Sequence, residues 1–169
     1  MSDEASKQSA LITEEPNGVL REGVTNSRII LFSCSAYRSM CDSLFEQFQS
    51  GSGVILYRMG QGYARKLVEG VSNLNLPTEE TIKIYQRLSL GAGWGNVKIK
   101  VTEGQVPECT SYRSAFVLRR KDAGSTTCYF FAGALSTIAR SLVRKEEVVV
   151  KEVECEAGGF ERCRFVINV

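Results

Sequence analysis

Apolar residues in the first half of the chain recur at the three- and four-residue spacing of an amphipathic helix. The first such run comprises Cys41, Leu44, Phe45 and Phe48. It predicts a helix over residues 36–49, and the same kind of spacing predicts two more helices, over residues 53–70 and 78–90. Apart from a short β-type run at residues 28–32, these three helices precede every predicted strand.

The spacing changes to two in the second half of the chain. Alternation of apolar and polar residues predicts four strands, over residues 96–102, 112–118, 148–155 and 163–167. An apolar helix that starts at Ser125 or Thr126 and reaches Leu142 interrupts them. Helices first and then strands with one inserted helix predict an α+β fold, in which N-terminal helices pack on an antiparallel sheet.

The 169 residues are enough for one domain with a hydrophobic core. Residues 1–27 are polar and include a cluster of turn-forming residues at 14–18, so they predict a flexible N-terminal arm with a short extended piece around Gly18–Leu20. Residues 28–169 are predicted to form the single domain.

Charge and apolar runs exclude two classes of partner. The 21 basic and 19 acidic residues are well mixed, and a net charge of +2 does not favour binding to nucleic-acid phosphates. No window approaches the length of an apolar membrane span, and the N-terminus lacks the pattern of a signal peptide. We therefore expect a cytoplasmic protein that binds no nucleic acid and does not span a membrane.

The inventory of reactive side chains restricts the chemistry further. The chain has no histidine, which excludes imidazole bases and histidine metal sites. It has six cysteines: Cys34, Cys41, Cys109, Cys128, Cys155 and Cys163. In the cytoplasm such residues are more often buried, reactive or metal-bound than paired in disulfides. Thiolates and carboxylates are therefore the charged metal ligands that this chain can offer.

Three cysteines fall at positions that the predicted fold brings together. Cys155 and Cys163 flank a glycine-containing loop, and cross-strand neighbours in such a hairpin have Cβ atoms about 4.5–5.5 Å apart. Cys128 lies at the start of the inserted helix, where the helix N-terminus favours a thiolate. Three thiolates suit tetrahedral zinc, which needs a fourth ligand; Cys109 is our candidate, with Glu108 as the alternative.

Two other interpretations of these cysteines stay open at this point. The sequence contains no Cys-x-x-Cys pair, and buried free cysteine is a common core residue. A redox switch is the remaining alternative. Spacing alone does not decide between zinc, inert core residues and redox chemistry.

Several segments resemble the 4-vinyl reductase domain, a hydrocarbon-binding family. The resemblance covers roughly residues 28–168, and its most specific part is the C-terminal cysteine pattern. The residues that carry it are Cys128-Tyr-Phe-Phe-Ala-Gly133, Val149–Cys155, Gly159, Cys163-Arg-Phe165, the helix motif Tyr57-x-x-Gly60-x-Gly62 and the glycine turn at 91–95. The family includes small archaeal proteins and the aromatic-sensing domains of certain bacterial transcription activators. It is related in fold to the TRAPP vesicle-tethering subunits.

The resemblance implies a TRAPP-like α+β fold that is commonly dimeric and encloses a cavity for a small hydrophobic ligand. In the aromatic sensors, the positions that match Cys128, Cys155 and Cys163 hold zinc. This chain departs from the family where a glycine usually follows four residues after Gly133. Thr137 stands there instead, which would narrow a cavity between packed helices.

Three functions follow from these observations. The first is a sensor module that binds a hydrophobic or aromatic ligand, forms a homodimer and reports through a signalling partner. Its candidate lining residues are Tyr57, Trp94, Phe116, Phe130 and Phe131, although aromatic residues can equally fill a core. The second is a dimeric scaffold without ligand, for which Gly60 and Gly62 would permit close helix approach. A vinyl reductase is the least favoured, because no cofactor-binding motif such as GxGxxG is present; we therefore do not expect an enzyme.

Overall fold

The structure is a computed structural model that describes residues 12–23, 25–101, 107–118 and 126–168. The α-helices in these ranges are α1 (Cys34–Phe48), α2 (Ser52–Ser72), α3 (Thr78–Gly91) and α4 (Tyr129–Val143). The strands are β1 (Ile12–Glu14), β2 (Leu20–Glu22), β3 (Arg28–Ile29), β4 (Asn96–Lys100), β5 (Glu108–Tyr112), β6 (Val149–Glu154) and β7 (Cys163–Asn168). Short 3₁₀ turns follow α1 at Gln49–Gly51 and β6 at Glu156–Gly158.

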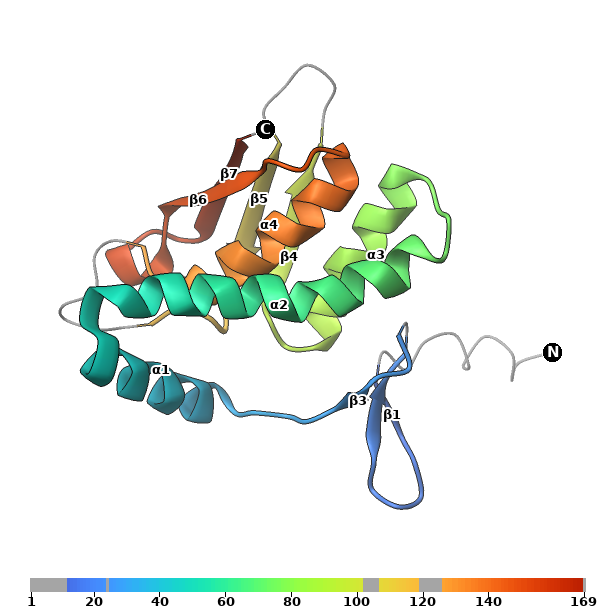
Figure 1. The fold of residues 1–169 in the computed structure, drawn as a ribbon, viewed down its shortest axis with the longest axis horizontal. Helices are drawn as coiled ribbons and strands as arrows, with labels where there is room; N and C mark the ends of the chain where they lie inside the picture. Colours follow the sequence, from blue (N-terminus) through green and yellow to red (C-terminus); the bar gives the residue numbers. More distant parts are fainter. Residues whose placement is uncertain (1–11, 24, 102–106, 119–125, 169) are drawn as a thin grey trace.

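Four of these strands form an antiparallel sheet in the order β4-β5-β7-β6. Apolar and small side chains on alternate positions give the sheet one buried face, while lysine, arginine and threonine side chains on the other positions face outward. Helix α4 lies across the buried face, α3 packs beside β4, and α2 crosses over α4 (Figure 1). The predicted α+β class, with helices on an antiparallel sheet and one inserted helix, is confirmed.

The three N-terminal helices agree closely with their predicted ranges. Helix α1 begins two residues earlier than predicted because the Ser33 side chain accepts a hydrogen bond from Ala36 N (3.1 Å), which caps the helix. Helix α3 has Glu79 and Glu80 in its first turn, where acidic groups favour the helix dipole. None of the helices in the described ranges combines the length and the apolar character that crossing a membrane requires.

The described part of the N-terminal arm is more ordered than the sequence predicts. Strands β1, β2 and β3 pair as a small antiparallel sheet, and β2–β3 pairing crosses the predicted boundary at residues 27 and 28. The β-type run expected at 28–32 is a strand only at Arg28–Ile29. Residues 30–33 then connect β3 to α1 and run beside α2 (Figure 1).

The predicted strand at 112–118 is wrong. The strand β5 ends at Tyr112, because Arg113 has a φ of 54°, which turns the chain out of the sheet. Residues 114–118 follow without regular structure, although Phe116 and Leu118 are buried. The inserted helix also begins later than predicted, at Tyr129, and the solvated turn predicted at 119–124 lies outside the described residues.

Candidate metal site and ligand cavity

Four buried side chains converge where α4 begins above the β6–β7 hairpin. They are Cys128, Glu152, Cys155 and Cys163, and their sulfur and carboxylate oxygen atoms all lie within 4.8 Å of one another. The Sγ atom of Cys163 is 3.6 Å from that of Cys128 and 3.8 Å from that of Cys155. The hairpin and the helix N-terminus therefore bring together the three cysteines that the sequence analysis grouped.

Glu152 is the member of this cluster that the sequence analysis missed. In a regular strand Glu152 and Cys155, three residues apart, would point to opposite faces of the sheet. The pairing of β6 with β7 shifts register between Glu152 and Glu154, a bulge-type irregularity. Both Glu152 and Cys155 are consequently buried on the same side, while Val153 between them is turned outward.

Cys109, proposed from the sequence as the fourth ligand, is not part of the cluster. It lies on β5 opposite Phe165, whereas Cys163 is opposite Ser111, one step along the same face. Residues diagonal to one another on neighbouring strands are about 7–8 Å apart, so Cys109 is too distant to share an ion with Cys163. The alternative, Glu108, pairs with Arg164 (2.9 Å) on the outer face.

Hydrogen-bond donors around the cluster favour a negatively charged Cys155. The thiols of Cys128 and Cys163 and the hydroxyl of Thr127 surround its sulfur, and these contacts lower the pKa of Cys155 well below its ordinary value. The pKa of Cys128 is instead raised, first by its contacts with Cys155 and Cys163 and then by burial. The thiolate that we expected at the helix start is thus favoured at Cys155.

The carboxyl group of Glu152 is held in an unusual position for an acidic side chain. Its Oε2 accepts a hydrogen bond from Cys128 N (2.9 Å), which satisfies a donor at the α4 N-terminus. Its Oε1 is buried and has no hydrogen-bond partner. Burial raises the pKa of Glu152 to about 8. A bare carboxylate oxygen beside three sulfur atoms is an arrangement that a cation would stabilise.

The donor set fits a metal ion. Tetrahedral coordination at Zn–S distances of about 2.3 Å separates ligand atoms by about 3.8 Å, close to the sulfur separations found here. The N–H of Glu156 also points to Cys163 Sγ (3.5 Å), a contact that stabilises a thiolate. With three sulfur atoms and one unsatisfied carboxylate oxygen, the cluster could hold a metal ion.

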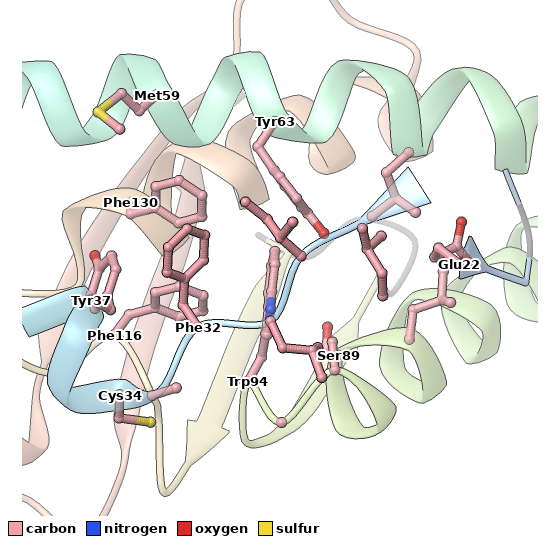
Figure 2. Close-up of a pocket in the computed structure, with 18 of the residues that line it drawn as sticks. Glu22, Phe32, Cys34, Tyr37, Met59, Tyr63, Ser89, Trp94, Phe116 and Phe130 are labelled. Carbon is pink, nitrogen blue, oxygen red and sulfur yellow. The ribbon is translucent and has the colours of Figure 1, made fainter. Parts of the chain in front are cut away.

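A second feature is a cavity of about 530 Å³ between the helices and the segment that leads from β3 to α1 (Figure 2). Its lining is mostly apolar. The lining residues are Ile12, Glu22, residues 28–34, Tyr37, Met40, Cys41, Leu44, Leu56, Met59, Tyr63, Leu67, Tyr85, Leu88, Ser89, Ala92, Gly93, Trp94, Ala115, Phe116, Phe130 and Ile138. Ligand sites for small molecules have this size and this predominantly apolar character.

Five aromatic rings in contact with one another form one wall of the cavity. The rings of Trp94 and Phe116 meet edge to face with centroids 4.9 Å apart, and Phe116 stacks on Phe130 at 5.2 Å. Tyr37 packs edge-on against Phe116 at 5.4 Å, and Tyr63 lies 5.1 Å from Trp94. This set, Tyr37, Tyr63, Trp94, Phe116 and Phe130, is called the aromatic wall below.

Three of the five predicted lining residues, Trp94, Phe116 and Phe130, do line the cavity, and two do not. Phe131 is buried in the core, where its ring meets Phe165 at 5.2 Å. Tyr57 packs against the same core from α2. The sequence analysis missed Tyr37 and Tyr63, for which the helical spacing of apolar residues gave no separate signal.

Thr137, the departure from the family pattern, lies between helices and does not line the cavity. Its hydroxyl donates a hydrogen bond to the carbonyl oxygen of Gln61 on α2 (3.4 Å). The expectation that this residue narrows a cavity is therefore not met in this structure.

One short segment links the cysteine cluster to the cavity. The hydroxyl of Ser114 lies 3.8 Å from Cys128 Sγ and accepts a hydrogen bond from Phe116 N (3.3 Å). A little further along, Leu118 N donates to the hydroxyl of Thr127, which lies beside Cys155 (3.5 Å). The cluster therefore anchors the segment that presents Phe116 to the cavity.

An α+β fold with an apolar cavity and a buried cysteine cluster defines a small class of proteins, and comparison with known proteins identifies it. Residues 108–169 match the family model of the vinyl-4-reductase domain, which confirms the resemblance seen in the C-terminal sequence. A search of curated proteins found no match.

Solved structures with the same fold extend this finding to most of the chain. The phenol-responsive sensory domain of the transcription activator PoxR, solved with phenol, has a TM-score of 0.78 at 16% identity and covers 92% of this chain and 83% of that chain. A vinyl-4-reductase family protein from Methanocaldococcus jannaschii has a TM-score of 0.56 at 17% identity, with 86% and 85% covered. A trafficking protein particle complex subunit 3 from Naegleria fowleri, covalently bound to palmitic acid, has a TM-score of 0.56 at 10% identity, with 80% and 91% covered. At these identities the likeness shows a shared, TRAPP-like fold.

Proposed function

We propose that this protein is a cytoplasmic sensor module that binds a small apolar molecule in the cavity beside the aromatic wall. The observation that carries the proposal is the cavity of about 530 Å³, whose surface is mostly apolar side chains from α1, α2, α3 and the β3–α1 segment. An empty apolar space of that size leaves its lining without packing partners, which a bound apolar ligand would supply.

Two of the similar structures support this assignment. The PoxR domain is described as phenol-responsive, and the Naegleria fowleri subunit is covalently bound to palmitic acid. One molecule is a single ring and the other a long chain, and both are apolar over most of their surface. We infer that the ligand of this chain belongs to the same broad class.

We further propose that the cluster of Cys128, Glu152, Cys155 and Cys163 binds zinc as a structural clasp. Soft sulfur donors favour zinc over magnesium or calcium, and four protein ligands leave no open position for catalysis. The metal would fix the start of α4 to the β6–β7 hairpin. Metal analysis of protein purified without added metal or chelator tests this assignment; a metal-free protein with reactive thiols would favour redox or plain core cysteines.

Ligand binding is tested by placing a charge in the cavity wall. Met59 and Val54 are both exposed residues of α2, but only Met59 lines the cavity. Met59→Lys should weaken the binding of a fluorescent apolar probe by about tenfold or more, because the ammonium group loses hydration beside the ligand. Val54→Lys should bind like the wild type. Equal binding by both variants, or no binding by the wild type, would contradict the proposed site and favour the ligand-free scaffold.

We also propose that the protein acts as a homodimer and reports ligand binding to a partner protein. Three consecutive apolar residues, Ile30, Leu31 and Phe32, are 70%, 66% and 58% exposed, and a contiguous apolar patch of this kind marks an interaction surface. Sedimentation equilibrium should give a dimer mass that Leu31→Glu reduces to that of a monomer. Leu76→Glu, at another exposed leucine, should leave the dimer intact. A wild-type monomer at all concentrations would disprove the dimer.

A further inference from the structure

The cavity follows helix α2 for about three turns. Leu56, Met59, Tyr63 and Leu67 all line it, and their spacing places them on one stripe of the helix. An α-helix rises 1.5 Å per residue, so the stripe from Leu56 to Leu67 is about 16 Å long. The lining is therefore elongated along the helix rather than gathered around one point.

The opposite wall has the same direction and a similar length. Every residue from Arg28 to Cys34 lines the cavity, and this segment runs beside α2 with little regular structure (Figure 2). An extended chain advances about 3.3 Å per residue, so these residues cover roughly 20 Å. The two walls thus enclose a channel-shaped space, with Tyr37 at one end and Glu22 at the other in the same view.

Polar character is confined to one end of this space. Among the described lining residues only Glu22 and Arg28 carry a charge, and both belong to the small N-terminal sheet. Between that sheet and Leu44 the lining has apolar, aromatic and small hydroxyl or thiol side chains. A ligand that fills the space must accordingly be apolar over nearly its whole length.

These dimensions exceed those of a single ring. Aromatic rings pack with centroids about 4.5–7 Å apart, so one ring would occupy less than half of the stripe on α2. A hydrocarbon chain extended over about 16 Å has roughly 13 bonds, at about 1.2 Å per bond in an extended chain. On the basis of the proposed ligand-binding function, we propose that the cavity takes an elongated hydrocarbon chain of about a dozen carbon atoms.

The test uses Trp94, which is the only tryptophan in the sequence and lies in the aromatic wall. Its fluorescence is titrated with a series of linear alcohols from butanol to hexadecanol, and with phenol and toluene as single-ring comparators. The dissociation constant should fall roughly fourfold for each added methylene group until the chain reaches about a dozen carbons, and then level off.

A variant that shortens the space should move this limit. Leu67 lies at the end of the stripe nearest the N-terminal sheet, so Leu67→Phe should make the affinity level off at a shorter chain while butanol binds as in the wild type. Leu74→Phe, at an exposed leucine that does not line the cavity, is the matched control and should leave the limit unchanged.

The outcomes separate this inference from the proposed function. Tighter binding of phenol or toluene than of the long alcohols, or an affinity independent of chain length, would overturn the elongated ligand but leave a ligand-binding module. The same limit in wild type and Leu67→Phe would also overturn it, because the chain would then lie elsewhere. No response to any of these compounds would remove the proposed function itself.

Discussion

Gly60 on α2 and Gly133 on α4 face each other where the two helices cross. A Cβ atom at Gly60 would overlap the carbonyl oxygen of Phe130, and one at Gly133 would overlap that of Tyr57. Each glycine thus lies against the backbone of the other helix, three residues before its counterpart. This contact sets how closely α2 approaches α4, and hence how near the aromatic wall lies to the α2 stripe.

The glycine contact predicts unequal effects of two similar substitutions. Gly60→Ala should lower the free energy of unfolding by roughly 1–3 kcal/mol, because the added methyl group has no space at the crossing. Gly62→Ala is the control: its Cβ would meet only the Arg65 side chain at 3.6 Å, and alanine favours helix by about 0.5–1 kcal/mol. Urea unfolding of both variants measures the difference. Equal stabilities would show that the crossing is not tight.

Metal retention should distinguish the cluster cysteines from the other buried ones. Cys128→Ser, Cys155→Ser and Cys163→Ser should each lose the bound metal and melt at a lower temperature, because structural zinc contributes directly to folding stability. Cys109→Ser changes an equally buried thiol outside the cluster and should keep the metal. Elemental analysis with thermal melting provides the measurement. Metal retained by Cys155→Ser would contradict the assigned ligands.

Glu152→Gln tests the carboxylate separately from the sulfur atoms. The amide keeps the shape of the side chain and can still accept the hydrogen bond from Cys128 N, but it removes the negative charge. We expect weaker metal binding, seen as faster metal loss to a competing chelator, with the fold unchanged by circular dichroism. Loss at the wild-type rate would mean that Glu152 only caps α4.

Thiol reactivity should single out Cys34. It is exposed, whereas the other five cysteines are buried. A maleimide reagent should therefore label one thiol per chain in the native protein, and Cys34→Ser should abolish that labelling. Because Cys34 also lines the cavity, a bound apolar ligand should slow the reaction. Mass spectrometry of the labelled protein checks both points; rapid labelling of several thiols would show an open cluster.

Ser114 should couple the metal site to the ligand. Its hydroxyl contacts Cys128 Sγ and accepts the hydrogen bond from Phe116 N, so Ser114→Ala removes both interactions. We expect the metal to remain, since no ligand is lost, and the affinity for apolar ligands to fall severalfold as Phe116 becomes less fixed. Metal content and Trp94 fluorescence titration together measure the effect. Unchanged ligand affinity would separate the two sites.

Much of the fold was predictable because its helices and outer strands have regular spacing. The three N-terminal helices and the β6–β7 hairpin follow from apolar positions that repeat every three to four residues or every two residues. The end of β5 did not follow, because it depends on a positive φ at Arg113, and arginine has no special preference for that conformation.

The candidate sites differ in how far the sequence reveals them. Cysteines are few and chemically distinctive, so Cys128, Cys155 and Cys163 were recognisable as a group. Glu152 was not, because the alternation along the strand put it on the opposite face and the bulge reversed this. The adjacent residues Phe130 and Phe131 show the same difficulty for the cavity, since one lines it and the other fills the core.

The cysteine cluster and the cavity come from different parts of the chain. All four cluster residues lie between Cys128 and Cys163, while most of the cavity lining lies before residue 95. Selection can therefore alter ligand preference through substitutions in the N-terminal half without disturbing the clasp. This separation offers a physical reason why the family model matches residues 108–169, the part that must stay constant while related proteins diverge in what they bind.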